Sequence, residues 1–332
     1  MTFFADRAND ALLERGAATD PDNPFLIGSY MHAQRALGFD AWLFGLEQVS
    51  TMQAASLGMI KSGRIRRSLT INSLPELSGD SPFWKGIEDF CTDRGITDLE
   101  LATFASPESV IPRLKGEIER IQRTEFILSL VGRDVVAELS KHHRERVKKG
   151  RKNGLTIRRT RSGEALDAHI GLRAHSMGRR EARGEKVPHD FARESAAKFL
   201  ESGAGELYQA MLHDEIVSSL LILQSASGAY FESAGTSSSG MSIGASHFLL
   251  VETARALQTD GVVTFFLGGA RRTEEGLYSY KAGFGAVAID TESVSAYVGG
   301  RWRRGVSEVV ESAQKAISAN MRRKTTVPDR AD

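Results

Sequence analysis

The chain has 332 residues, with 43 Lys and Arg against 42 Asp and Glu, and 41% of its side chains are hydrophobic. This composition is typical of a globular protein and excludes a disordered, collagenous or coiled-coil chain. The length favours two domains or one large one, and a formal net charge of +1 gives no overall attraction to nucleic acid. The single cysteine, Cys91, excludes an intramolecular disulfide and is interpreted as a core residue.

The first 20 residues carry acidic side chains and contain no sustained apolar run. They therefore predict neither a signal peptide nor a transmembrane helix. We expect a cytoplasmic protein that does not act as a membrane component.

Short apolar runs bounded by turn residues predict several strands and one helix in the first half of the chain. Phe83, Ile87 and Phe90 recur at helical spacing before Gly95, so a helix is expected over residues 82–94. The strands expected in this half span residues 40–46, 53–60, 65–71, 98–104 and 126–130.

Helices and strands then alternate without a strict strand–helix repeat, which predicts an α+β fold with a mixed sheet. The polar end of the chain, residues 322–332, is expected to fray. Helices are expected over residues 134–153, 163–181, 189–202, 243–259 and 275–282. Strands are expected over residues 155–159, 207–213, 216–224, 228–234, 262–267 and 287–291.

The most basic segment, residues 141–161, holds ten Lys or Arg and only one opposing carboxylate. On a helix, Arg144, Lys148 and Lys152 fall on one face, with Lys149 beside them. Such a face is either a solvated basic surface or a site for the phosphates of a partner. His142 and His143 are adjacent on this helix, so their side chains point in different directions and predict no metal site.

A Gly- and Ser-rich stretch, residues 236–249, lies between a predicted strand and a predicted helix. Free backbone N–H groups at a helix start can bind an anion. The alternative is a flexible turn in which Ser242 caps the helix. A third segment, residues 267–285, places Lys281 between Tyr280 and the sequence Gly283-Phe284-Gly285. A lysine near a helix end is usually a surface residue, which is the alternative interpretation here.

In their order and spacing, these three segments resemble the Fem-like aminoacyltransferase and acetyltransferase family. The family's basic helix is matched by residues 143–149, and the spacing of Ser239, Ser242 and Gly244 resembles the pyrophosphate loop of Gcn5-related N-acetyltransferases. The family's further signature is matched by Gly276-Leu277, Tyr280-Lys281 and Phe284-Gly285.

The resemblance covers residues 135–297, and more faintly residues 64–104. It implies the fold of the Gcn5-related N-acetyltransferases (GNAT), in two tandem repeats with mixed β-sheets. The implied domains are a degenerate first repeat over residues 1–130 and a second repeat, carrying the motifs, over residues 131–300. A C-terminal helix and polar tail are expected over residues 301–332.

The same resemblance implies an acyltransferase that forms an amide by moving an aminoacyl group from aminoacyl-tRNA to an amine of a small molecule or peptide. An acyl-CoA-dependent N-acyltransferase is the alternative, and an RNA-binding module without catalysis is a third possibility. In the first two cases the co-substrate is aminoacyl-tRNA or acyl-CoA, and neither a tightly bound cofactor nor a metal is expected.

The resemblance also implies roles for single residues. Lys281 would stabilise the oxyanion and Tyr280 would stack on the terminal adenosine of tRNA. Apart from the resemblance, amide formation needs a general base, and the candidates are Glu232 on a predicted strand and Glu252 on the following helix, with a structural or surface carboxylate as the alternative for each. A carboxylate on the inner face of a strand would have the raised pKa that such a base needs. Two lobes are expected to meet near residues 106–132, with the Gly/Ser stretch and Lys281 opening on one cleft. Donor binding is expected at Ser239, Ser242, Gly244 and Ala245, and tRNA phosphate binding at Arg144, Lys148, Lys149 and Lys152.

Overall fold

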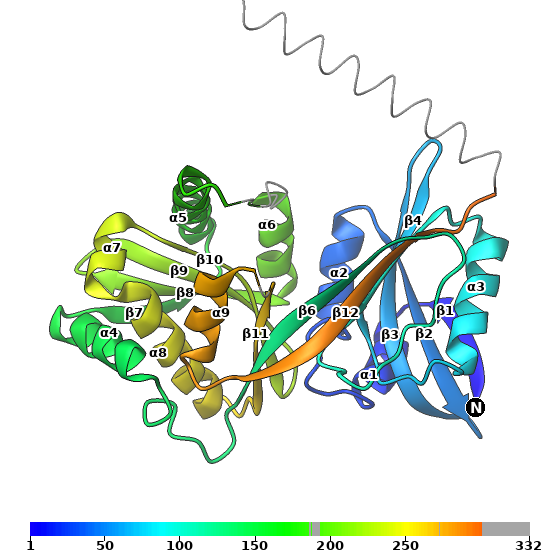
Figure 1. Cartoon of the computed structure of the whole chain (residues 1–332), viewed down its shortest axis with the longest axis horizontal. Coiled ribbons are helices and arrows are strands. Elements are labelled where there is room, and N and C mark those ends of the chain that lie inside the picture. Colours follow the sequence, from blue (N-terminus) through cyan, green and yellow to red (C-terminus); the bar gives the residue numbers. More distant parts are fainter. Residues whose placement is uncertain (186, 188–192, 272, 301–332) are drawn as a thin grey trace, which may run out of the picture.

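The computed structural model describes residues 1–185, 187, 193–271 and 273–300. Its strands form one sheet of twelve strands in the order β1-β2-β3-β4-β5-β12-β6-β11-β10-β9-β8-β7. Figure 1 shows two lobes side by side, with β6 (Glu117–Ser129) and β12 (Val287–Tyr297) as long strands running between them. The α+β class with a mixed sheet, predicted above, is confirmed.

The first lobe contains the elements that precede β6 in the sequence. These are β1 (Thr2–Arg7), α1 (Asp10–Ala17), α2 (Gly28–Ala36), β2 (Asp40–Gln48), β3 (Thr51–Ser62), β4 (Arg67–Leu74), α3 (Pro82–Arg94) and β5 (Asp98–Thr103).

The second lobe contains the described elements between β6 and β12. These are α4 (Lys141–Lys152), β7 (Thr156–Thr160), α5 (Gly163–Ala182), α6 (Arg193–Ser202), β8 (Gly205–Leu212), β9 (Glu215–Gln224), β10 (Gly228–Thr236), α7 (Ser238–Ile243), α8 (Ala245–Thr259), β11 (Thr264–Ala270) and α9 (Glu275–Ala282).

The two lobes repeat one arrangement. In each, antiparallel strands lead through a helix to a parallel neighbour, β4–α3–β5 in the first lobe and β10–α8–β11 in the second. A parallel pair needs such a crossover because its two strands start at the same edge of the sheet. The predicted domain boundary at residue 130 directly follows the end of β6, which pairs with β11 as well as with β12, and this division stays a prediction.

Three apolar cores support the sheet. One lies under α3 in the first lobe, and one lies between α4, α8 and the sheet in the second. The third joins the lobes, because α1, α2 and β3 share it with α5 and α6. On β9, Leu220 and Ile222 enter the core under α8, whereas Leu221 and Leu223 enter the core that joins the lobes. This strand is buried on both faces, which explains its continuous apolar sequence.

Most elements lie where they were expected, and α3 and α9 match at both ends. The helix expected from residue 134 begins at Lys141, because Ser140 caps it and Asp134 holds a separate turn. The sequence analysis missed β1, α1, α2 and α7, and it started β6 too late. The tail expected over residues 301–332 lies outside the described residues. No described helix is both long and apolar enough to cross a membrane.

The hairpin between β2 and β3 contains backbone strain. Gln48 pairs with Thr51, so Val49 and Ser50 form a two-residue turn, and both have positive φ, 49° and 63°. Such a turn favours Asn-Gly, and a β-branched residue adopts it at a cost of about 1–2 kcal/mol. Val49 packs against little, since 93% of its surface is exposed.

Replacing this turn by Asn-Gly should stabilise the protein. We expect Val49→Asn combined with Ser50→Gly to raise the free energy of unfolding by about 1–2 kcal/mol, measured by urea denaturation. Val110 is exposed on ordinary backbone and provides the control, since Val110→Asn should give no such gain. Equal or lower stability of the double variant would contradict this account.

Candidate functional site

The parallel strands β10 and β11 separate in the middle of the sheet. They pair only from Gly228–Thr264 to Tyr230–Phe266, although both continue beyond these residues. Each strand then carries a bulge, at Glu232 in β10 and at residues 267–268 in β11. Bulges bend a strand and end its pairing. We call the resulting opening the splay.

Lys281 reaches into the splay from α9. Its Nζ donates a hydrogen bond of 2.7 Å to the carbonyl oxygen of Gly269, and the side chain is buried. A Cβ on Gly268 would stand 3.5 Å from this Nζ and 3.5 Å from the hydroxyl of Tyr230. Burial lowers the pKa of Lys281 to about 8, against the opposing effect of the Glu125 carboxylate. A cation is thus held at the centre of the sheet, close to its titration point at neutral pH.

Two charged side chains of β6 reach the same place. A Cβ on Gly269 would stand 2.6 Å from Oε1 of Glu125 and 3.0 Å from Nη2 of Arg123. Because these residues are two apart on a strand, their side chains lie on one face of the sheet. Burial raises the pKa of Glu125, and the charges of Arg123 and Lys281 oppose this rise. Gly269 therefore leaves room for three charged groups around one peptide unit.

Glu232, the residue at the β10 bulge, lies with Glu125 in a cavity between the lobes. Burial raises the pKa of Glu232, and the nearby charge of Arg173 opposes the rise. This interlobe cavity has a volume of about 410 Å³. Its walls include Phe25, Tyr30, Asn72, Phe104, Phe199 and Tyr230.

The aromatic rings of the interlobe cavity pack against one another. The ring of Phe25 lies 5.3 Å from Tyr30, 5.0 Å from Phe104 and 5.0 Å from Tyr230, centroid to centroid. All three pairs are edge-to-face, the geometry that aromatic quadrupoles favour. Tyr30 also stacks on Phe199 of α6. Residues from both lobes thus build one apolar wall beside the two carboxylates.

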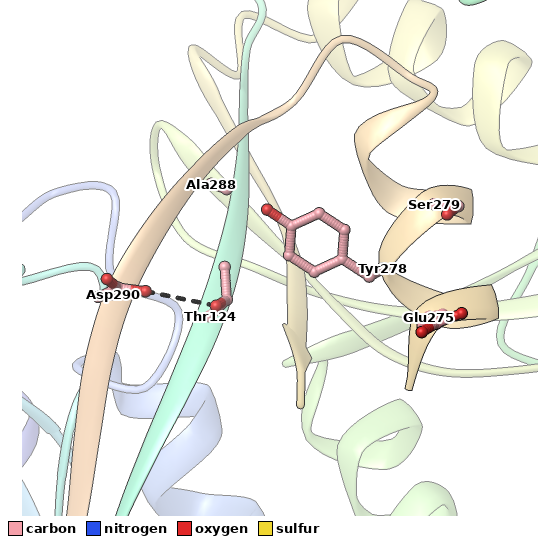
Figure 2. A pocket seen from close by; sticks show the side chains of 6 residues that line it. All are labelled: Thr124, Glu275, Tyr278, Ser279, Ala288 and Asp290. Atoms are coloured by element: carbon pink, nitrogen blue, oxygen red, sulfur yellow. Dashed lines mark hydrogen bonds between the residues drawn. The ribbon is translucent and has the colours of Figure 1, made fainter. Parts of the chain in front are cut away.

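A second cavity, of about 520 Å³, lies between α9, β6 and β12. Figure 2 shows the hydroxyl of Tyr278 pointing from α9 toward these strands, and Thr124 donating a hydrogen bond to Asp290. Thr124 lies on the opposite face of β6 from Arg123 and Glu125, because side chains alternate along a strand. The sheet therefore has a cavity on each face near the splay.

Tyr280 does not share the surroundings of Lys281. Its hydroxyl donates to the carbonyl oxygen of Ser246, 3.3 Å away, and its ring packs beside His143 and His247. Burial, followed by the charges of His143 and other basic neighbours, lowers the pKa of His247 to about 3. Neighbouring side chains on a helix point about 100° apart, so Tyr280 and Lys281 cannot both point into one small cavity. Stacking of Tyr280 on an adenosine stays a prediction.

The open loop that was expected between residue 236 and the helix predicted from residue 243 is not present. Ser238–Ile243 form the helix α7, capped by Ser237, whose Oγ accepts from the amide of Gly240 at 3.0 Å. Ser242 is not the cap, since its hydroxyl donates to the carbonyl of Ser239. The amide of Gly244 donates to Met241, and a Cβ on Gly244 would stand 2.4 Å from the carbonyl oxygen of Arg146 in α4.

These contacts leave Gly244 and Ala245 buried and Ser239 and Ser242 on the surface. The described residues that line the interlobe cavity include Glu232 but none from residues 236–249. The structure therefore does not place the Gly/Ser stretch on this cavity. Donor binding at these four residues stays a prediction.

The basic helix exists as α4, and its cations differ in their surroundings. Nη2 of Arg144 donates to the carbonyls of Ala137 and Leu139 and so closes the preceding turn. Lys148, Lys149 and Lys152 are exposed and form no ion pair with the described residues. Glu252 pairs with Arg151 of this helix at 2.7 Å, outside the interlobe cavity, so Glu232 is the better-placed of the two candidate bases.

No group of three or more His, Cys, Asp or Glu in the described ranges could hold a metal ion. Cys91 lies on the buried face of α3, and burial raises the pKa of its thiol to about 12. It is therefore a core residue, as expected, and an unreactive one.

Glu125 and Arg123 were not among the site residues predicted from the sequence. A signal for them was present, because charged residues occupy positions 117, 119, 123 and 125, two or four apart, before β6 becomes apolar at Phe126. Alternate positions of a strand share one face, so Arg123 and Glu125 point to the same side of the sheet just before its buried part. The strand was expected to begin only at residue 126, so these positions were assigned to no element.

Residues 137–282 match the family model described as an acetyltransferase (GNAT) domain. No protein of curated function matches the chain in sequence. Among solved structures, the chain is similar to FemX with a TM-score of 0.64 and 12% identity, over 87% of this chain and 96% of that one.

Two further structures are similar at a TM-score of 0.52. A tandem GNAT protein from the clavulanic acid biosynthesis pathway is 11% identical, over 90% of this chain and 99% of that one. A C-terminal domain assigned to lysylphosphatidylglycerol synthetase in Agrobacterium fabrum is 15% identical, over 89% and 94%. At these identities the structures establish the fold, which is the GNAT fold in two repeats, as predicted.

The charges around Gly269 predict two shifts of opposite sign in the titration of Lys281. Glu125→Gln removes the carboxylate that favours the ammonium, so the pKa of Lys281 should fall below about 8. Arg123→Gln removes a repelling charge, so the pKa should rise. NMR titration of the lysine side-chain carbons, assigned with Lys281→Met, measures both. Shifts of the same sign in the two variants would show that the three charges do not act on one another.

Proposed function

This chain is an acyltransferase of the GNAT type, with its GNAT domain over residues 137–282, and we propose that it forms an amide by transferring an aminoacyl group to an amine. The donor is an aminoacyl-tRNA, and the acceptor is a small molecule or peptide. The observation that carries this proposal is the Lys281 ammonium, held in the splay by the carbonyl oxygen of Gly269 and favoured by the charge of the Glu125 carboxylate.

Lys281 stabilises the negative charge that develops on the carbonyl oxygen. As the amine nitrogen forms its bond to the carbonyl carbon, the carbonyl oxygen becomes an oxyanion. A fixed cation in a site shielded from water stabilises this charge more than it stabilises the uncharged ester. Glu125 keeps Lys281 protonated, since its carboxylate raises the pKa of the ammonium.

Glu232 accepts the proton that the amine loses. Burial raises the pKa of this carboxyl toward neutrality, which is where a general base works best. The C–N bond then replaces the ester C–O bond, and the freed hydroxyl of the donor takes up the proton that Glu232 accepted. No covalent intermediate on the protein is needed.

Two features favour aminoacyl-tRNA as the donor. The exposed cations of α4 offer a site for RNA phosphates, and His143 ties this helix to α9 through a hydrogen bond of 2.8 Å to the carbonyl of Tyr280. In addition, α7 occupies the stretch that an open phosphate-binding loop would need. One structural neighbour is assigned to lysylphosphatidylglycerol synthesis, and that product carries a lysyl group.

An acyl-CoA donor is the alternative, favoured by different findings. The matching family model is an acetyltransferase domain, and the tandem GNAT neighbour is described in relation to AcCoA. Incubation with radiolabelled acyl-CoAs and, separately, with charged bulk tRNA, with and without RNase, distinguishes the two. RNase-sensitive transfer supports the tRNA donor, and transfer from acyl-CoA alone refutes it.

Neutralising Lys281 should reduce turnover more than binding. Lys281→Met keeps the aliphatic stem and removes the charge, so we expect kcat to fall about 100- to 1000-fold at saturating donor. In the parent enzyme kcat should also fall above pH 8, as Lys281 loses its proton, because its pKa is about 8. The variant should lack this alkaline limb.

Two other results would give Lys281 a different role. A raised KM at unchanged kcat would mean that it contacts only the donor. An unchanged kcat and an unchanged pH profile would refute its role in the reaction.

The exposed cations of α4 should control the salt dependence of tRNA binding. Replacing Lys148, Lys149 and Lys152 together by Gln should weaken binding and reduce the slope of log Kd against log salt by about 0.7–0.9 for each RNA phosphate that the helix no longer neutralises. Gln at Lys61 and Lys115, exposed lysines of the first lobe, provides the matched control. An unchanged slope in the triple variant would show that α4 is only a solvated basic surface and does not bind RNA phosphates.

A further inference from the structure

We propose that the acceptor is a free α-amino acid with an apolar side chain, bound as a zwitterion, with its carboxylate on Arg123 and its ammonium between Glu125 and Glu232. This inference rests on the proposed function, because it identifies the molecule whose nitrogen is acylated. Three features of the interlobe cavity carry it, namely a free guanidinium, a pair of carboxylates and an aromatic wall.

Arg123 is a cation without a partner among the described residues. Its guanidinium makes no hydrogen bond or ion pair with them, although its charge acts on Glu125 and Lys281. It lines the interlobe cavity and two adjoining cavities, of about 230 Å³ and 620 Å³. A guanidinium that is free to present its planar fork binds a carboxylate through two parallel hydrogen bonds. The site therefore has a preformed position for one carboxylate.

The negatively charged side chain of Glu125 lies next to the Arg123 guanidinium. Arg123 and Glu125 are alternate residues of β6, so their Cα atoms are about 6.8 Å apart, and both side chains reach Gly269. An α-amino acid carries its carboxylate and its ammonium on one carbon atom. Its carboxylate and its ammonium are therefore close enough together to contact Arg123 and Glu125 at the same time.

The ammonium position has a carboxylate on each side. In the sheet, β11 lies between β6 and β10, and thus between Glu125 and Glu232. At this level β11 contributes Gly268 and Gly269, which have no side chain to fill the space. The amine of a bound amino acid would lie over these glycines, beside Lys281, with Glu232 available to accept its proton.

The aromatic wall identifies the remaining part of the ligand. Phe25, Tyr30, Phe104 and Tyr230 form one cluster of rings in the same cavity as the two carboxylates. Such a wall favours an apolar or aromatic side chain through burial and edge-to-face contact. A volume of about 410 Å³ suits a single amino acid.

Other amines fit the charges less well. The first residue of a peptide has a free amine, but its carboxyl is in an amide bond and offers Arg123 no negative charge. A diamine would place a second cation against the guanidinium. Each of these would leave a charge of the site without a partner, which costs binding free energy.

The test is calorimetric binding of L-phenylalanine and of L-phenylalaninamide to the full chain without donor. The amide lacks only the negative charge, so we expect it to bind about 10- to 100-fold more weakly. Arg123→Gln should weaken binding of phenylalanine and reduce this ratio to about one. Arg113→Gln, at an exposed arginine of the first lobe, should leave the ratio unchanged, and equal unfolding midpoints should show that the variants fold.

The outcomes separate this inference from the proposed function. Equal binding of phenylalanine and its amide, no binding of phenylalanine at millimolar concentration, or an unchanged ratio in Arg123→Gln would overturn the inference. Acyl transfer to the amide as efficient as transfer to phenylalanine would also overturn it, while the acyltransferase function would stand. Arg123-dependent binding of phenylalanine without transfer from any donor would refute the proposed function and leave this amino-acid site in place.

Discussion

The loss of pairing between β10 and β11 is the constraint on which the rest of the site depends. A regular sheet has no room for a charged side chain in its plane, because its backbone groups bond one another and its strands are about 4.8 Å apart. Bulges at Glu232 and at residues 267–268 end the ladder, so the carbonyl of Gly269 can accept from Lys281 instead. Burial lowers the pKa of this ammonium and raises the pKa of the Glu125 carboxyl, and each charge opposes the shift of the other, so the charges of the site depend on one another.

The first lobe forms part of the wall of the interlobe cavity. Its α2 packs on α6, where Tyr30 stacks on Phe199, and its Asp22 accepts hydrogen bonds from Ser227 and from Thr264 of β11. The backbones approach so closely that a Cβ on Gly228 would stand 1.8 Å from the carbonyl oxygen of Asp22. A shared apolar core then fixes the two lobes against each other. Tandem repetition of one fold therefore gives the interlobe cavity walls from both lobes.

On the other face of the sheet, α4, α8 and α9 connect the basic surface to the splay. A Cβ on Gly283 would stand within 2.3–2.6 Å of the atoms of the His143 ring, so this glycine permits the contact between α4 and α9. His143 also bonds the backbone of Tyr280, and Tyr280 bonds Ser246 of α8. Burial lowers the pKa of His143, so the neutral ring acts as a structural link. A ligand on α4 would thus lie on the same rigid layer that positions Lys281.

The mixed α+β class, most of the second lobe, the basic helix and the candidate residue Lys281 could be predicted from the sequence, because apolar periodicity and local motifs lie within single segments. It did not reveal β1, α1 and α2, whose apolar faces are short and are stabilised mainly by contacts with distant strands. Only the tertiary structure decided that α7 replaces an open loop, that Tyr280 points away from Lys281, and that Arg123 and Glu125 reach Gly269. The physical reason is that a site between strands depends on register and bulges, and the pairing that brings β6 beside β11 joins residues more than a hundred positions apart in the chain.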